Sequence, residues 1–181
     1  MTPTYNDGVI SGGSLATGGN TAVAAAVWDR AKTNHTTVGT YGGDMVVRVV
    51  KTITFTGAAG LGAIGNVPLF TVTGSVRIAS ILPRCTTTLV GATATLALGV
   101  TANTALFIAA TTATGIATNS IWVDTAPDAN GVALPALMKD ILINDDDEIV
   151  GTVAVANVTG GVLEIVVEYV PESSGSSIVA A

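Results

Sequence analysis

The chain has 181 residues, a length that fits one domain of ordinary size. Its net charge is −6 and its seven basic residues are spread along the sequence without clustering, which excludes the electrostatic footprint of a nucleic-acid-binding protein. Charged residues make up 11% of the chain and hydrophobic residues 49%, whereas an average soluble protein is about a quarter charged. Because so few charges leave large apolar patches on a lone monomer, we expect other subunits of an assembly to cover much of the surface.

Residues 1–43 are predicted to form an N-terminal arm. The first 20 residues are rich in Gly, Ser, Thr and Asn and have no apolar period, which is typical of an extended segment or one ordered by a partner. A short helix is predicted near residues 21–32, where alanine is frequent and Asn20 or Thr21 is suited to cap the N-terminus. The N-terminus lacks a basic region followed by an apolar stretch, so we do not expect Sec export.

Three aromatic side chains of the arm are candidates for contact with a partner: Tyr5, Trp28 and Tyr41. Buried aromatic residues often carry interface energy, and Trp28 on the predicted helix is suited to anchor the arm in a neighbour's groove. Packing of Trp28 against its own domain is an open alternative. The second tryptophan, Trp122, lies in an apolar run and is expected in the core.

Residues 44–171 are predicted to form a β-sandwich or jelly-roll domain. Short runs of β-branched residues are bounded by Gly, Pro or Asn, which is the pattern of an all-β fold of about eight strands. Pro68 is expected at a strand start or a sheet edge, and Pro83 is expected to end a strand. The predicted runs are 45–55, 67–73, 76–82, 86–90, 94–100, 105–110, 121–123, 148–155 and 162–169.

The last two predicted strands are the clearest. They flank a turn over residues 156–161, where Gly160 and Gly161 are available for positive φ. In the second of these strands Glu164 and Glu168 lie on one face and the apolar residues at odd positions on the other, because side chains alternate with period two. We therefore expect one face to pack in the core and the other to contact either solvent or another subunit. The Ser- and Gly-rich residues 172–181 are expected to form a flexible tail.

The residues that usually carry catalysis are scarce. The single histidine, His35, lies in a polar stretch, so a general base is missing and we do not expect an enzyme or a cofactor. The single cysteine, Cys85, has no partner for an intrachain disulfide and is expected to be a small apolar filler. Gly60, Gly62 and Gly65 have the spacing of a dinucleotide fingerprint, but another β-branched run follows them instead of a helix, which favours a loop between two strands.

The acidic run at residues 145–148 is the one constellation with possible metal chemistry. Asp145 and Asp147 are weak candidate ligands, since hard cations such as calcium prefer carboxylate oxygens. The run lacks the spaced ligands and the turn glycine of a helix-loop-helix calcium site. An acidic, solvated turn ahead of a strand is the favoured interpretation, and no metal site is expected.

Residues 46–171 resemble the small virion proteins of tailed bacteriophages that are encoded near capsid genes. The resemblance is carried by three segments, namely residues 50–74, residues 93–104 and the closing Ile165-Val-Val-Glu-Tyr-Val-Pro171. It implies a decoration or cement protein, made in the host cytoplasm, that binds the major capsid protein on the outside of the head, often as a homotrimer. The arm would then latch onto the capsid or onto neighbouring subunits.

Two other functions stay open from the sequence. One is a structural component of the phage tail or fibre. The other is a carbohydrate-binding or adhesion module, because β-sandwiches host such sites. Against a sugar site, the chain has only eight aromatic residues, and sugar platforms usually need an exposed Trp or Tyr at a pocket. Nucleic acid is not an expected partner, because the basic residues do not cluster. A membrane is not expected either, since no stretch of about 20 residues is predominantly apolar and aliphatic.

Overall fold

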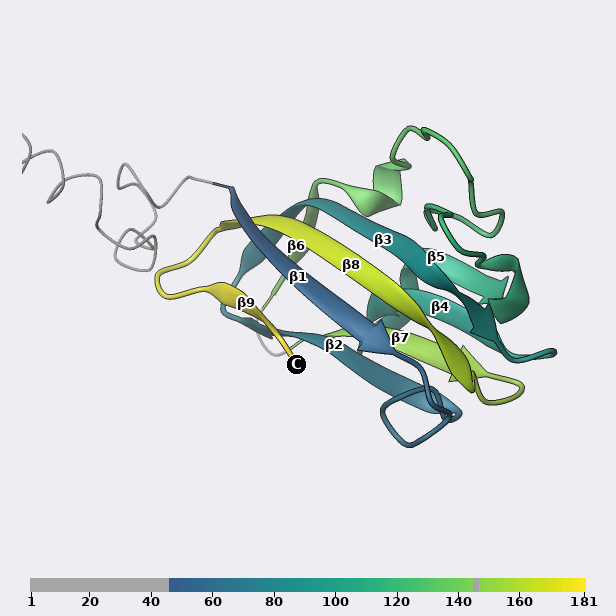
Figure 1. Ribbon diagram of the computed structural model, residues 1–181. Helices are drawn as coiled ribbons and strands as arrows, with labels where there is room; N and C mark the ends of the chain where they lie inside the picture. Colours follow the sequence, from purple (N-terminus) through teal and green to yellow (C-terminus); the bar gives the residue numbers. More distant parts are fainter. Residues whose placement is uncertain (1–45, 145–146) are drawn as a thin grey trace, which may run out of the picture. The chain divides into compact units, whose positions relative to one another are not determined.

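Branched and other apolar residues, which pack well on a pleated surface, form the strands of two antiparallel sheets in the computed structural model (Figure 1). The structure describes residues 46–144 and 147–181. One sheet has four strands in the order β1-β8-β3-β6 and the other has five in the order β5-β4-β7-β2-β9. The strands are β1 (Val47–Thr54), β2 (Gly65–Thr73), β3 (Val76–Val90), β4 (Thr95–Val100), β5 (Asn103–Thr112), β6 (Ile141–Ile143), β7 (Ile149–Ala154), β8 (Gly160–Pro171) and β9 (Ser177–Ala180).

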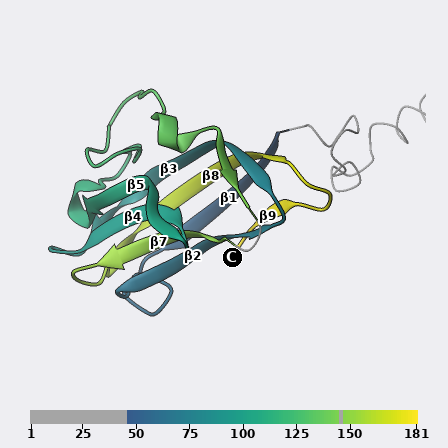
Figure 2. The same cartoon turned by 180° about the vertical axis from the view of Figure 1, so that it is seen from behind.

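The pairing of the strands is that of a jelly roll. The first strand pairs with the eighth, the second with the seventh, the third with the sixth and the fourth with the fifth, all antiparallel. Pairs β3–β8 and β4–β7 then complete the two sheets of a sandwich, which Figure 2 shows from behind. The predicted all-β, jelly-roll-like sandwich is therefore confirmed, and β9 adds one strand beside β2.

The core lies between the two sheets. Along β8 the odd-numbered residues Leu163, Ile165, Val167 and Tyr169 are at most 5% exposed, whereas Glu164 and Glu168 on the other face are partly exposed. The predicted alternation of this strand is confirmed. Two short 3-10 helices, η2 (Ala113–Gly115) and η3 (Ala136–Met138), lie in the long connection from β5 to β6 and bury Ala113 and Met138.

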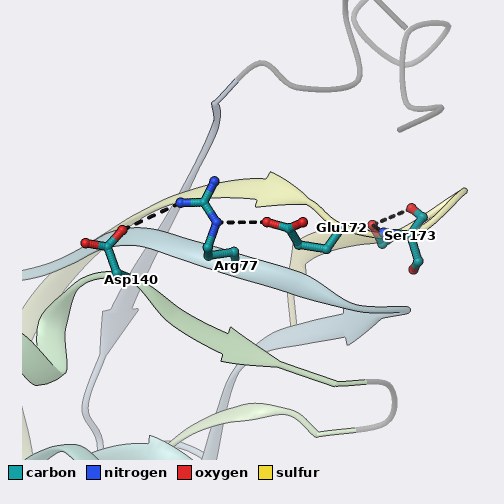
Figure 3. A network of polar contacts seen from close by, with 5 residues as sticks. Arg77, Asp140, Glu172 and Ser173 are labelled. Carbon is teal, nitrogen blue, oxygen red and sulfur yellow. Dashed lines mark hydrogen bonds and ion pairs between the residues drawn. The ribbon is translucent and has the colours of Figure 1, made fainter. Parts of the chain in front are cut away.

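The expectation of a flexible tail at residues 172–181 is wrong. Ser177–Ala180 form β9, which pairs with β2, and Ile178 is 4% exposed. The connection before β9 is held by polar contacts shown in Figure 3: Arg77 Nε donates to Glu172 Oε1 at 2.8 Å and Arg77 Nη1 lies 3.6 Å from Asp140 Oδ1. In the same connection the Ser176 hydroxyl donates to the Ser173 carbonyl at 2.7 Å, so these Ser-rich residues are held by specific bonds.

Pro83 does not end a strand, because β3 continues through it. Pro83 is in register with Ile165 of β8, and its carbonyl accepts a hydrogen bond from Trp122 N at 3.0 Å on the opposite side. Since the nitrogen and carbonyl of one residue in an antiparallel strand point the same way, the missing N–H faces the Trp122 segment. No ladder bond to β8 is lost. The run 121–123 itself makes only isolated bridges and is not a strand.

The turn predicted at residues 156–161 does not join paired strands. β7 lies in the five-stranded sheet and β8 in the four-stranded sheet, so the connection crosses from one sheet to the other. Gly161 has the expected positive φ, at 102°. Pro68 lies inside the β2 ladder opposite Val150, at a part of β2 that β9 does not reach, so the expectation of a local sheet edge holds. The predicted arm and its helix at 21–32 fall outside the described residues.

Candidate interaction surface

The structure leaves most predicted site residues undescribed. Tyr5, Trp28, Tyr41 and Asp145 lie outside residues 46–144 and 147–181. Asp147 is described, and its Oδ1 accepts a hydrogen bond from Ala102 N at 3.1 Å, which ties the acidic run to the β4–β5 turn. No group of three or more His, Cys, Asp or Glu side chains within the described residues is arranged to hold a metal ion.

Cys85 and Trp122 are core residues, as the sequence predicts. Cys85 is 2% exposed, and its thiol donates to Ile116 O at 3.3 Å. Burial raises the pKa of the Cys85 thiol above its ordinary 9.0, against the opposing effect of backbone hydrogen bonds. Since the thiolate is disfavoured in the folded state, this contribution to stability is present below pH 9.0 and is lost as pH rises above it. The thiol is therefore not poised as a nucleophile.

The glycine triplet at Gly60, Gly62 and Gly65 lies in the connection from β1 to β2, and all three residues have positive φ. β2 begins at Gly65, so strand follows strand and no helix N-terminus is present to hold a pyrophosphate. The prediction of a loop between two strands is confirmed. Of the three glycines only Gly62 lies in a close contact between loops, since a Cβ there would overlap the Val158 carbonyl oxygen.

Charge is distributed unequally between the two sheets. The five strands of one sheet, β2, β4, β5, β7 and β9, contain no Asp, Glu, Lys or Arg. All charged residues of the described strands lie in the four-stranded sheet, and they are Arg48, Lys51, Arg77, Arg84, Glu164 and Glu168. The strands on one side of the sandwich thus lack charged side chains, the groups whose desolvation opposes burial most strongly.

The outer face of the five-stranded sheet carries small polar and apolar residues. Asn66 and Ala97 flank Thr152 in register, and the Thr152 hydroxyl donates to Asn66 Oδ1 at 3.1 Å. Pro68 is exposed in the next row, and Val179 on β9 is 53% exposed. Depletion of charge at the centre of a surface patch is the compositional mark of protein–protein interfaces.

Three connections at one end of the sandwich continue this uncharged surface. They are residues 55–64, 91–94 and 155–159, and none of them contains a charged residue. Figure 1 shows them together beyond the ends of β1, β3 and β7, and Figure 2 agrees. Together with the last residue of β3, Val90, they display four large hydrophobic residues, which we call the apolar tip: Leu61 (43% exposed), Ile64 (60%), Val90 (53%) and Val155 (70%).

The apolar tip is held by hydrogen bonds between its loops. Val158 N donates to Gly62 O at 2.7 Å, and Thr159 N donates to Val90 O at 2.7 Å. The Asn157 side chain accepts from Ile64 N at 3.1 Å. These bonds connect all three strand ends that carry the tip residues. The hydrophobic side chains are therefore presented by an ordered frame, which lowers the entropy cost of binding a partner.

Val155 has a backbone conformation that a β-branched residue rarely adopts. Its φ is +69°, and Ala156 N donates to Ala154 O at 2.8 Å, a bond across two residues that defines a γ-turn. Strain of this kind costs of order 1–3 kcal/mol and clusters at functional sites. Although this backbone is strained, its side chain stays 70% exposed. Val155 thus combines a strained backbone with an exposed apolar side chain.

The open side between β1 and β2 is protected against added strands. A groove of about 470 Å³ there is lined by residues that include Pro68 and Lys51. Lys51 shares the inward-facing side of β1 with Ile53, and its Nζ donates to the Ala181 carbonyl. An inward-pointing lysine and a proline are common devices that prevent edge-to-edge pairing of sheets. Interaction surfaces are therefore expected on faces and loops.

No family model, no curated protein and no solved structure matches the chain. Among the described residues, no helix has the length and hydropathy needed to cross a membrane. The apolar tip was not among the predicted sites. Its loops are visible in the sequence as uncharged segments, but the exposure of Leu61, Ile64, Val90 and Val155 depends on how the three connections meet.

Proposed function

We propose that this chain is a structural virion protein of a tailed bacteriophage that binds the outside of the head and stabilises it. The observation that carries the proposal is the uncharged surface that runs from the five-stranded sheet to the apolar tip. Such a surface costs little to desolvate and suits permanent burial in an assembly. Jelly rolls occur in viral capsid proteins as well as in lectins and cupins, so the fold alone does not decide the function.

In this proposal the partners are the major capsid protein and further copies of the chain, with a homotrimer as the expected self-assembly. The apolar tip supplies hydrophobic contact with the shell, because four large apolar side chains are exposed on an ordered frame. The arm, residues 1–43, contributes Tyr5, Trp28 and Tyr41 as anchors. No catalytic role is proposed.

A test compares particles that contain this chain with particles that lack it. We expect particles without the chain to lose their nucleic acid at a lower temperature and after milder osmotic shock, since bridging contacts between shell subunits are removed. Release of nucleic acid measured with a dye during heating reports the difference. Equal survival of both particles would argue against cementing. Fractionation that recovers the chain with tails would support the alternative of a tail or fibre component.

Replacing Val155 with glycine separates binding from folding. The free energy of unfolding is expected to stay within about 1 kcal/mol of the original, because relief of the positive-φ strain offsets the entropy cost of glycine. Binding to shells purified without the chain is expected to weaken about tenfold, as for loss of an apolar contact side chain. Cosedimentation with the shells measures this.

The matched control is Leu142→Ala, which removes a side chain of similar exposure, 60%, from β6 outside the apolar tip. This variant should bind shells as the original chain does. If Val155→Gly binds as tightly as the control, the apolar tip is not the shell contact.

A carbohydrate-binding function is disfavoured within the described residues. Sugar platforms require exposed aromatic rings. The five aromatic residues that the structure describes are all at most 5% exposed, and they are Phe55, Phe70, Phe107, Trp122 and Tyr169. The described part of the chain therefore offers no ring on which a sugar would stack.

A further inference from the structure

The outer face of the four-stranded sheet has a regular chemical pattern in which a row of apolar residues separates two charged rows. In register across β1, β8 and β3, Val50 lies beside Val166, which lies beside Leu82. This apolar row crosses three strands at the middle of the sheet. Val50 is 37% exposed at its outer end.

The charged rows lie on either side of the apolar row. Arg48 is opposite Glu168 on one side, and Thr52 is opposite Glu164 on the other. Arg84 continues the second row, with its Nε 3.9 Å from Glu164 Oε1. The pattern places a cation on the edge strand β1 and carboxylates on the neighbouring strand β8.

Arg48 has no partner within the described part of the chain, although it lies directly across from a carboxylate. Glu168 Oε2 instead accepts a hydrogen bond from the Ser80 hydroxyl at 3.0 Å. Arg48 is exposed, as are Val50 and Thr52, which follow it on the same face of β1. An exposed arginine beside a partly buried carboxylate leaves charge-assisted hydrogen bonds available to a partner.

We propose that this face binds the same face of a second copy of the chain in an antiparallel, twofold contact. Consider a twofold axis in the interface that runs parallel to the strands between β1 and β8. It lays β1 of each copy over β8 of the other. Arg48 of each copy then faces Glu168 of the other, and Val50 faces Val166, each contact occurring twice. The face is therefore complementary to itself in charge, as an isologous interface requires, and the 37% exposed Val50 covers the 8% exposed Val166 at the centre of the apolar row.

The register with the axis directly over β8 is unfavourable. An axis directly over β8 would set β8 over itself, so Glu168 would face a carboxylate of the other copy. Like charges placed opposite one another across an interface cost several kcal/mol. An axis between β1 and β8 replaces this repulsion with two reciprocal ion pairs. An axis between β8 and β3 would set Arg84 over Glu164 of the other copy, but Arg84 already lies 3.9 Å from Glu164 of its own chain, whereas Arg48 has no ion-pair partner among the described residues.

This inference goes beyond the proposed function, since it concerns the purified chain alone. A twofold contact pairs chains, so sedimentation equilibrium should detect dimers, or species with even numbers of chains if trimers also form. Association should weaken as salt is added, because the ion pairs are near the surface. A chain that stays monomeric or purely trimeric at concentrations of about 100 μM would overturn the proposal.

Two single charge reversals give the decisive test. Arg48→Glu and Glu168→Arg should each lower self-association at least tenfold, because each creates like charges across the contact. Mixed in equal amounts, the two variants should associate again to within a fewfold of the original, since every facing pair then joins opposite charges. Restoration by mixing cannot come from a change inside one chain. If the mixture associates no better than the single variants, the proposed contact is wrong.

A third variant covers the case in which a charge reversal prevents folding. Val50→Lys places a charge at the exposed end of the apolar row while leaving the core residues on the inner face of β1 unchanged. Circular dichroism should match the original chain, and self-association should fall at least tenfold. Unchanged self-association of this folded variant would also contradict the proposal.

Discussion

Replacing Trp122 with alanine is expected to lower the free energy of unfolding by about 3–5 kcal/mol, the range for truncation of a large buried aromatic residue. Trp122 is 0% exposed, and its Nε1 donates to the Thr111 hydroxyl at 3.0 Å. Its backbone nitrogen also donates to Pro83 O. A domain of ordinary size has about 5–15 kcal/mol of stability, so the variant is expected to be marginal at best. Urea unfolding followed by circular dichroism measures the loss.

Two further substitutions separate packing from hydrogen bonding at this position. Trp122→Phe keeps most of the apolar volume but removes the indole donor, so an intermediate loss is expected. The Thr111 hydroxyl would still donate to Ala109 O, at 3.0 Å. Leu137→Ala is the control, since Leu137 is 53% exposed and its truncation should cost no more than about 0.5 kcal/mol. If Trp122→Ala cost no more than this control, the burial and hydrogen bonds of Trp122 would contribute little to stability.

Much of the fold is predictable from local patterns. Strand β8 follows directly from its alternation, because burial of Leu163 and Ile165 on one face leaves Glu164 on the other. The class of fold follows in the same way from the repeated short β-branched runs. Strand pairing does not, since β7 and β8 are separated by a short connection and yet lie in different sheets. That choice depends on contacts with β2 and β1, which are distant in the sequence.

Two local rules failed for identifiable physical reasons. Proline at position 83 predicts the end of a strand, but the position of its missing N–H is on the side away from β8, so the strand continues. The Ser- and Gly-rich composition of residues 172–181 predicts a flexible tail. In the structure Ile178 is buried and β9 pairs with the edge of β2. Both outcomes depend on what lies beside the segment in space, which composition does not report.

The candidate surface was predictable in kind but not in place. Low charge in the sequence predicts large uncharged areas on the surface, and coverage of them by other subunits stays a prediction. The separation of charge between the sheets becomes visible only when the strand order is known. Val155 is a further example: nothing in its sequence context predicts a positive φ, because no glycine or asparagine occupies the position.

The last expected result concerns the glycine triplet, where two alanine substitutions separate a close contact from backbone strain. A Cβ on Gly62 would overlap the carbonyl oxygen of Val158 and lie 3.1 Å from Phe55 Cδ1, whereas a Cβ on Gly60 would meet nothing within 4 Å. Both residues have positive φ, at 112° and 71°. Gly60→Ala is therefore expected to cost about 1 kcal/mol, from the conformation alone.

Gly62→Ala is expected to cost about 3 kcal/mol or more, because Val158 cannot withdraw without breaking the bond that its N–H donates to Gly62 O at 2.7 Å. Thermal unfolding of the two variants gives the difference directly. Equal losses would mean that the loops separate freely, and the ordered frame of the apolar tip would then be in doubt. A larger loss at Gly62 would instead assign this glycine to the packing of the β1–β2 and β7–β8 connections, and through them to the presentation of Ile64 and Val155.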